Sequence, residues 1–325
     1  MKRDIPISQL MPGDILLSRS RGLISEAIRF IDRSQVSHSA LFIGRHGGTG
    51  RSVGEAIRAG VVRRELSKSI EHADWVESRR LKEPPAALAP VLERAAHYLD
   101  RGERYAFEQV LLLAFLCISR NLADSPVLGG LIRETLDAAA GFLLRLFDTG
   151  LQPMICSEFV FRCYDEPLPG TIELSARAPG AIRFGEREVP RGAGGGIHRG
   201  SALFLLLERH GGKLPEGDGT SAAPLPAPAS PEGSSLEERI GEYFRDLQRR
   251  TPKSARVDLA SPELSPSFER FASSLHRARQ RPEEPQVPRS AVLGSLIEAA
   301  ADFVTPGDLQ RSRSLAFCGK LKTKE

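Results

Sequence analysis

Apolar and polar residues alternate over short stretches in the first eighty residues, which is typical of half-buried strands. Glycine-containing stretches such as RHGGTGR at 45–51 separate several of these stretches and predict turns or hairpin loops. The segment LISEAIRFID at 23–32 differs, because its apolar residues recur at helical spacing. The predicted strands are 12–18, which begins with a Pro-Gly turn, 37–44, 52–57, 60–66 and 74–81.

Helical spacing dominates after Pro84 and Pro85. Two of the predicted helices form a hairpin that bends at Ser125-Pro126, and the glycines of the second favour a shorter helix than its full pattern. The segment 202–208 is interpreted as a strand or a buried helical turn. The predicted helices are 90–102, 107–123, 127–147, 155–166, 236–250, 266–280 and 290–303.

Residues 211–235 are rich in Gly, Pro, Ala and Ser, a composition that buries too little apolar surface to offset the entropy of ordering. We interpret them as a flexible linker. It would separate a domain at 1–210 from a helical, partly disordered extension at 236–325. The last apolar residues, in VTPGDLQRSRSLAFCGKL, favour docking of this end on the main domain.

Composition narrows the function classes. Of 325 residues, 41% are hydrophobic and 26% charged, which is a soluble globular balance. The net charge of +4 is spread along the chain, so we expect no nucleic-acid binding, which needs a focused basic face. The apolar run VLLLAFLCI at 110–118 is too short to cross a bilayer, which takes about 20 residues. It predicts a buried helix, with contact at a membrane surface as the alternative.

The four cysteines, Cys117, Cys156, Cys163 and Cys318, form no CxxC pair and no zinc spacing. We therefore expect neither disulfides nor a metal site. The first residues show no apolar run of signal-peptide length, and the simplest interpretation is a cytoplasmic location, where a thiol stays reduced.

Cys156 is the candidate nucleophile. Pro153 precedes it and an apolar helical pattern follows, so it is expected in the first turn of a helix. The helix dipole there favours a thiolate by about 0.3–1 kcal/mol, which lowers a thiol pKa by up to roughly one unit. Helical spacing also places Cys156 on one face with Phe159, Val160 and Cys163, so an ordinary core cysteine remains the alternative. Cys163 is interpreted as a core residue.

Two further residues are candidates to complete a site with Cys156. His38 opens a predicted strand, which is a rigid support for a catalytic base, although a buried structural histidine is the alternative. Glu55 would orient His38 if 37–43 and 52–57 pair as a hairpin in the right register. An exposed strand carboxylate is the alternative for Glu55, and Glu65 is the second candidate for its role.

Read in order, PGDILLS, SHSALFIG, VGEAIRAGVV, Tyr105 and ICSEFV resemble the circularly permuted papain-like thiol hydrolases of the NlpC type. The YiiX-like enzymes are the nearest branch, and lecithin–retinol acyltransferases are more distant. The resemblance covers about residues 10–165. It implies an α+β fold, with a small antiparallel sheet packed on helices and the 107–147 hairpin as an insertion.

The resemblance also implies roles for individual residues. Cys156 matches the nucleophile, His38 the base and Glu55 the third polar group. The supporting or substrate-binding positions implied in the same way are Asp14, Ser37, Tyr105 and Ser157. The family usually has an aspartate after the tyrosine, and Ala106 stands there in this chain.

The implied activity is cleavage of an amide or ester bond through an acyl-enzyme on Cys156, without a metal or organic cofactor. The expected substrate is a peptide or an acyl lipid, and the 107–147 hairpin would be a lid or a peripheral membrane contact. A lipid acyltransferase and a non-catalytic binding module on the same fold are the alternatives. The sequence pattern indicates no particular oligomeric state.

Overall fold

The computed structural model divides into two compact units, each described here by itself. Unit 1 comprises Met1–Glu108, Met154–Ala176 and Val304–Glu325, and unit 2 comprises Gln109–Pro153 and Arg177–Phe303. The predicted linker lies outside the described residues except for Ser235, and the 202–208 segment does so except for Leu203. The described residues are 4–45, 50–57, 60–83, 85, 87–101, 104–106, 109–119, 123–124, 126–147, 152–174, 182–184, 187–189, 203, 235–249, 255–256, 261–279, 289–301 and 303–321.

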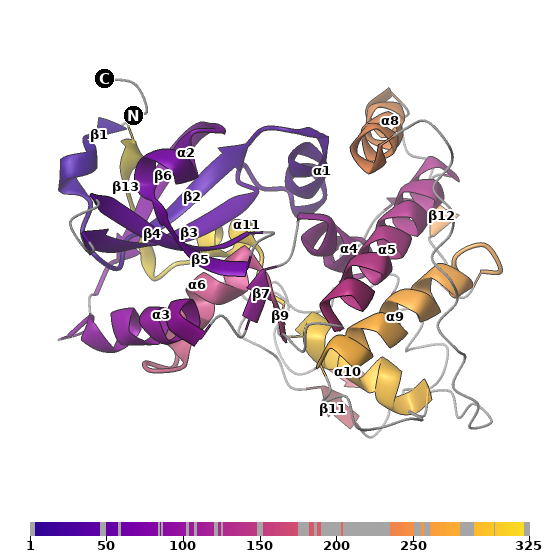
Figure 1. Cartoon of the computed structure of the whole chain (residues 1–325). Coiled ribbons are helices and arrows are strands. Elements are labelled where there is room, and N and C mark those ends of the chain that lie inside the picture. Colours follow the sequence, from indigo (N-terminus) through magenta and orange to yellow (C-terminus); the bar gives the residue numbers. More distant parts are fainter. Residues whose placement is uncertain are drawn as a thin grey trace. The chain divides into compact units, whose positions relative to one another are not determined.

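Unit 1 contains a seven-stranded mixed sheet in the order β1-β13-β6-β2-β3-β4-β5 (Figure 1). β1 and β13 pair in parallel, and the other neighbours pair antiparallel. The expected small antiparallel sheet is therefore corrected to a larger mixed one, because the C-terminal strand enters between β1 and β6. The strands are β1 (Asp4–Ile5), β2 (Ile15–Ser20), β3 (His38–Arg45), β4 (Arg51–Ile57), β5 (Gly60–Glu65), β6 (Ala73–Leu81) and β13 (Leu315–Leu321).

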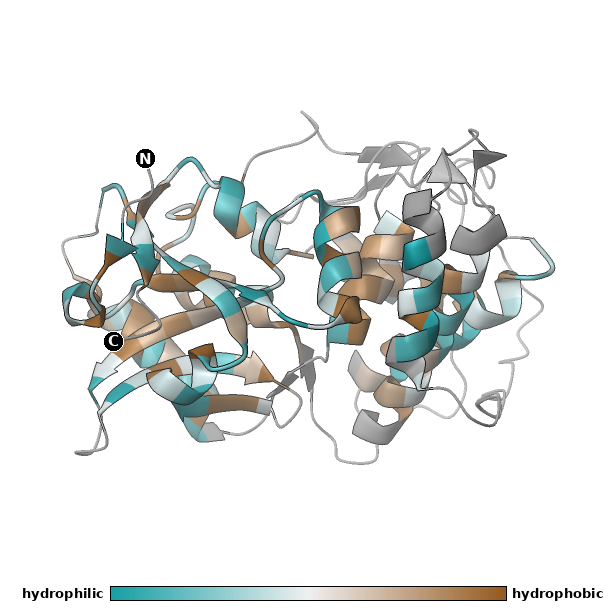
Figure 2. Cartoon of the chain, turned by 90° about the horizontal axis from the view of Figure 1, so that it is seen from above, coloured by the Kyte–Doolittle hydropathy of each residue, from teal (hydrophilic) through white to brown (hydrophobic). Residues whose placement is uncertain are grey.

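Both faces of this sheet are covered, which the alternation along its strands explains. On β2, Leu17 packs into a cluster with α3 and α6, while Leu16 packs into a second cluster with α2. Figure 1 shows α3 and α6 on one side of the strands and α2 on the other, and Figure 2 shows apolar colour along the strands. The other elements of the unit are η1 (Ile7–Gln9), α1 (Leu23–Asp32), α2 (Leu66–Ile70), α3 (Ala89–Arg101), β7 (Arg104–Ala106), α6 (Cys156–Asp165) and α11 (Pro306–Arg311).

Helix α6 packs on β3 and β4, and a glycine permits the close approach. A Cβ atom on Gly54 of β4 would lie 3.0 Å from Cζ of Phe159 on α6. Phe159 is completely buried, so its ring has little room to move. The helix that begins at Cys156 therefore lies close against β3 and β4.

Unit 2 contains a group of helices in which α5 (Pro126–Phe147) packs against α4 (Gln109–Ser119), α8 (Leu236–Arg249) and α9 (Ser265–Arg279). The expectation that the second hairpin helix is shorter than its pattern was wrong, because α5 runs over 22 residues and includes the whole pattern. Its Gly130 lets the Tyr243 ring of α8 come close, since a Cβ atom there would lie 2.7 Å from the ring. The other elements described in the unit are β8 (Ala123–Asp124), β10 (Ile182–Phe184), β11 (Arg187–Val189), α10 (Arg289–Ala301) and β12 (Ala255–Arg256), and β9 (Gln152–Met154) leads into α6.

The apolar helix α4 is buried throughout, from Val110 to Ser119, which confirms the predicted buried helix. Among the residues that the structure describes, no helix is both long enough and apolar enough to span a bilayer. The peripheral membrane contact of the 107–147 hairpin stays a prediction.

The Gly54 contact predicts a stability effect. Gly54→Ala forces the Phe159 ring or the strand to move, and we expect a loss of about 1–3 kcal/mol in the free energy of unfolding. Trp75 in β6 is the chain's single tryptophan, so its fluorescence during urea titration reports on unit 1. The control is Gly294→Ala in α10, where a Cβ atom meets nothing within 4 Å. Equal midpoints for the two variants would contradict the close packing of α6.

Candidate active site

Cys156 is the first residue of α6, as the sequence pattern predicts. The preceding residue, Ile155, is extended, and its backbone N–H donates to Glu158 Oε2 at 3.4 Å, which helps to cap the helix. The Cys156 side chain is buried in the cluster between α6 and the sheet, with 6% of the residue exposed. At this position the unpaired N–H groups of the first turn and the helix dipole favour a negative charge on sulfur.

The register of β3 and β4 brings His38 and Glu55 together. Glu55 pairs with Ala40, so His38, two residues earlier on β3, is its diagonal neighbour on the same face. The His38 ring donates from Nε2 to Glu55 Oε2, with 2.9 Å between the two atoms, when the imidazole is protonated there. The other ring nitrogen of His38 is then available to a different partner.

Glu55 is held by two further donors that the sequence analysis did not single out. Arg64 on β5 donates from Nη1 to Glu55 Oε1 at 2.9 Å, and Ser69 on α2 donates from Oγ to Oε2 at 2.9 Å. A signal for Arg64 was present, because in a hairpin of 52–57 with 60–66 it lies diagonally from Glu55 on one face. For Ser69 the sequence offers no comparable signal. Together these donors satisfy a carboxylate that is 1% exposed.

The charges of His38 and Cys156 stabilise each other. Burial alone would lower the pKa of His38, but the Cys156 charge and hydrogen bonds to Cys156 and Glu55 raise it to about 10. Burial alone would raise the pKa of the Cys156 thiol, yet the charge and hydrogen bond of His38 bring it below its usual value. Both pKa shifts are in the direction that favours a thiolate on Cys156 beside an imidazolium on His38.

The pKa of Glu55 is lowered overall, which favours the charged carboxylate beside His38. Burial raises the pKa of Glu55, but the hydrogen bond and charge of His38, followed by Ser69 and Arg64, lower it overall. A buried carboxylate without such partners would be neutral near neutral pH. Glu55 therefore carries a negative charge beside the imidazolium.

Ser39, the residue after His38, also borders the sulfur. Burial raises the pKa of Cys156, and hydrogen bonding to the Ser39 backbone contributes, after His38, to lowering it. The Ser39 hydroxyl is completely buried and has no hydrogen-bond partner among the described residues. Ser39 is thus a neighbour of the Cys156 sulfur that the sequence analysis missed.

Asp14, a predicted supporting residue, lies in the turn before β2. Its carboxylate accepts two hydrogen bonds from Arg80, at 2.5 and 2.7 Å, and one from the backbone N–H of Met11. It is completely buried, so the Arg80 guanidinium compensates its charge. In the structure, Asp14 thus ties this turn to β6.

The other three predicted supporting residues lie on different elements. Ser37 precedes β3, and its Oγ accepts from the Ser20 N–H at 3.2 Å. Ser157, next to Cys156, donates from Oγ to the carbonyl oxygen of Val304 at 2.6 Å. Tyr105 is in β7, and its predicted role stays a prediction.

The other cysteines of the described helices and the second candidate carboxylate, Glu65, lie in positions unsuited to these roles. Cys163 is completely buried in the core, and burial raises its pKa well above the usual value for a thiol. Burial also raises the pKa of Cys117, to about 12. Glu65, the second candidate to orient His38, is an exposed residue at the end of β5. Within the described part of the chain, no three His, Cys, Asp or Glu side chains gather as they would around a metal ion.

The fold and the site define an α+β protein in which a cysteine at a helix start lies beside a partly buried His-Glu pair. No family model matches the chain. In sequence it is 40% identical over 160 residues to the "Probable lipoprotein peptidase YaeF" of Escherichia coli (strain K12). The match covers 49% of this chain and 56% of YaeF, so the chain spans about half the length of this curated relative.

A solved structure, that of the metalloprotein yiiX from Escherichia coli O157:H7, matches at a TM-score of 0.37 with 16% identity. That match covers 96% of this chain and 98% of yiiX. The predicted resemblance is confirmed by the sequence comparison, because the chain is similar to a protein named as a peptidase.

The charge on Glu55 leads to a prediction for the pH dependence of Cys156 alkylation. Glu55→Gln removes the negative charge beside the His38 imidazolium, so we expect the pKa of His38 to fall and that of Cys156 to rise. We expect the apparent pKa for alkylation of Cys156 by iodoacetamide to rise by about one unit or more. Alkylation is measured from pH 5 to 9, and the modified cysteine is identified by peptide mass spectrometry.

The matched control is Glu65→Gln, which removes an exposed carboxylate near the end of the same hairpin. Its alkylation profile is expected to overlay that of the unmodified protein. If Glu65→Gln and Glu55→Gln shift the profile equally, the effect is one of net charge, and the specific role of Glu55 is wrong.

Proposed function

We propose that this protein is a thiol hydrolase of the peptidase type on a permuted papain-like fold, with Cys156 as nucleophile. The observation that carries the proposal is the mutual effect of His38 and Cys156 on their pKa values, with Glu55 behind the ring. A thiol becomes a strong nucleophile near neutral pH when an adjacent imidazole takes its proton and a third group orients the imidazole.

The order of the elements supports the permuted fold. The base on β3 and the carboxylate on β4 precede the cysteine helix α6 in the chain. Papain-like enzymes with the usual order begin with the cysteine helix, so a permuted chain places the histidine strand first. The site then depends on residues about 120 positions apart, which the packing of α6 on β3 brings together.

The reaction we propose has two stages. In the first, the Cys156 thiolate attacks a carbonyl carbon, and the His38 imidazolium gives its proton to the leaving amine or alcohol, which leaves an acyl-enzyme. In the second, neutral His38 takes a proton from water, hydroxide adds to the thioester carbonyl and the thiolate departs. The carboxylic acid is released and the thiolate–imidazolium pair is restored, with Glu55 orienting the ring throughout.

Developing negative charge on the substrate oxygen needs hydrogen-bond donors. The backbone N–H of Cys156 belongs to the first turn of α6, where N–H groups have no partner within the helix. It is therefore the first donor we propose for this oxyanion. Hydrogen bonding to the Ser39 backbone also lowers the pKa of Cys156, which favours the thiolate that forms and departs in each cycle.

The name of YaeF favours an amide substrate, and we propose a peptide or peptide-like amide for this chain. An acyl lipid is the second candidate, and it would make the protein a hydrolase or an acyltransferase according to whether water or an alcohol accepts the acyl group. The cytoplasmic location and the absence of a nucleic-acid partner stay predictions.

The proposal is tested with an acyl-type thiol probe, such as a peptidyl acyloxymethyl ketone with a fluorescent tag. We expect Cys156→Ala to abolish labelling at pH 7, because it removes the thiolate. Cys163→Ala is the matched control on the same helix and is expected to keep labelling. Labelling that persists in Cys156→Ala and disappears in Cys163→Ala would overturn the assignment.

A second measurement separates the alternatives. Incubation with peptide and lipid ester libraries, followed by rapid acid quench, traps the acyl-enzyme, and mass spectrometry of the Cys156 peptide identifies the acyl group. A binding module would alkylate no faster at pH 6 than a free cysteine and would trap no acyl group, which would contradict a hydrolase.

A further inference from the structure

The segment Val304–Arg311 lies far from Cys156 in sequence and contacts the first turn of its helix. The Ser157 hydroxyl donates to the carbonyl oxygen of Val304 at 2.6 Å, and this hydrogen bond is buried. Leu309 of α11 is completely buried in the same cluster as Cys156, and α11 packs against α6. One side of this segment is thus fixed to the helix that carries the proposed nucleophile.

The other side of the segment is fixed to the chain that leads into the proposed base. Asp32, the last residue of α1, is completely buried and lies six positions before His38. The Thr305 hydroxyl donates to Asp32 Oδ2 at 2.9 Å, and Arg311 donates from Nη2 to Oδ1 at 3.2 Å. Arg311 Nη1 also donates to the Asp32 carbonyl oxygen at 3.2 Å.

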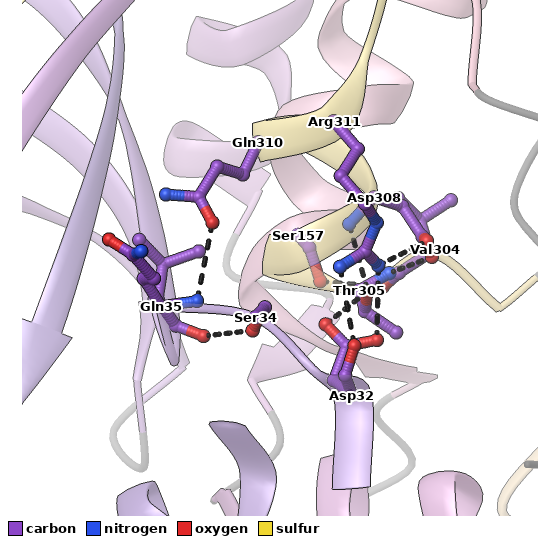
Figure 3. Close-up of polar contacts among 10 residues, drawn as sticks. Asp32, Ser34, Gln35, Ser157, Val304, Thr305, Asp308, Gln310 and Arg311 are labelled. Atoms are coloured by element: carbon purple, nitrogen blue, oxygen red, sulfur yellow. Dashed lines mark hydrogen bonds and ion pairs between the residues drawn. The ribbon is translucent and has the colours of Figure 1, made fainter. Parts of the chain in front are cut away.

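The N-terminus of α11 is capped by two reciprocal hydrogen bonds, which hold Thr305 in place. The Thr305 N–H donates to Asp308 Oδ2 at 3.0 Å, and the Asp308 N–H donates to Thr305 Oγ1 at 3.0 Å. Figure 3 shows Thr305 and Arg311 reaching Asp32, with Ser157 beside Val304. Gly307 permits the approach, since a Cβ atom there would lie 2.0 Å from Asp32 Oδ2.

A second contact reaches the same turn even closer to the base. The backbone N–H of Gln35, three residues before His38, donates to Gln310 Oε1 at 3.3 Å. Gln310 Nε2 in turn donates to Glu77 Oε1 on β6 at 3.2 Å. The segment therefore contacts both the last residue of α1, Asp32, and the turn that follows it, at Gln35.

We propose that Val304–Arg311 is a positioning segment that sets the distance between the Cys156 sulfur and the His38 ring. Asp32, Thr305 and Arg311 are its positioning residues, and Ser157 is the link to the nucleophile helix. The inference rests on the proposed function and names the part of the chain that keeps the two reacting groups aligned. Proton transfer and attack depend steeply on such alignment, because a displacement of about 1 Å can cost roughly a hundredfold in rate.

Two serines provide a matched comparison. Ser157→Ala removes the hydroxyl bonded to Val304, and Ser312→Ala removes a hydroxyl that donates to the Glu173 carbonyl oxygen at 2.8 Å. Both lose a serine-to-carbonyl bond of the C-terminal segment, but only the first touches the helix of Cys156. The readout is the rate of iodoacetamide alkylation of Cys156 as a function of pH in the full chain.

We expect Ser157→Ala to raise the apparent pKa of Cys156 alkylation by about one unit, which lowers the rate at pH 6 by roughly tenfold. Ser312→Ala should keep the profile of the unmodified protein. Cys163, buried on the same helix, serves as the folding monitor, since its protection from alkylation shows that α6 is still docked. Equal profiles for the two variants, shifted or not, would overturn the inference.

A second pair of variants, at Thr305, tests the same inference if Ser157→Ala does not fold. Thr305→Ser retains the hydroxyl that joins Asp308 and Asp32, whereas Thr305→Val removes it at nearly constant volume. We expect Thr305→Ser to keep the alkylation profile and Thr305→Val to shift it as Ser157→Ala does. A profile in Thr305→Val that matches Thr305→Ser, with Cys163 protected in both, would also overturn the inference.

Failure of the inference differs from failure of the proposed function. If Cys156 in the unmodified chain alkylates with the pH dependence of a free thiol, the proposed function fails. If it alkylates as a low-pKa thiol and neither variant changes this, only the positioning role fails.

Discussion

The partly buried hydrogen bond between His38 and Glu55, on one face of β3 and β4, is the interaction on which the rest of the site depends. A buried carboxylate and a buried imidazolium are each costly to desolvate unless partners compensate them. Arg64 and Ser69 compensate Glu55 from β5 and α2, and the Cys156 sulfur compensates His38 from the start of α6. Five elements, β3, β4, β5, α2 and α6, therefore meet at one network of charges, and the His38 charge in that network lowers the pKa of Cys156 against the effect of burial.

Such a network works only if the elements that carry it are held rigidly. Unit 1 is assembled from three separate stretches of the chain, and its last stretch supplies both strand β13 and helix α11. β13 fills the position between β1 and β6, and the segment before it bonds to Asp32 and to the residue beside Cys156. The C-terminal residues are in this sense an integral part of the catalytic unit that we propose.

Much of unit 1 was predictable because local sequence patterns indicate its elements. Strands β3, β4 and β5 were predicted from the alternation of apolar and polar residues between glycine turns, and helix α6 from its apolar spacing after Pro153. The mixed character of the sheet was not predictable, because β13 finds its neighbours across more than two hundred residues. The length of α5 was misjudged for a related reason, since packing of Tyr243 on Gly130 outweighs the weak helix propensity of glycine.

The sequence by itself determined the candidates Cys156, His38 and Glu55, because the residue types and the order of their motifs are local properties of the chain. Only the tertiary structure decided that Glu55 faces His38, since a slip of one residue between β3 and β4 would turn its side chain to the other face. The contacts of Ser69 and Ser39 with the site and the Thr305–Asp32 contact likewise became visible only in three dimensions. Register and long-range packing are set by the sum of many weak contacts, and no short stretch of sequence contains that sum.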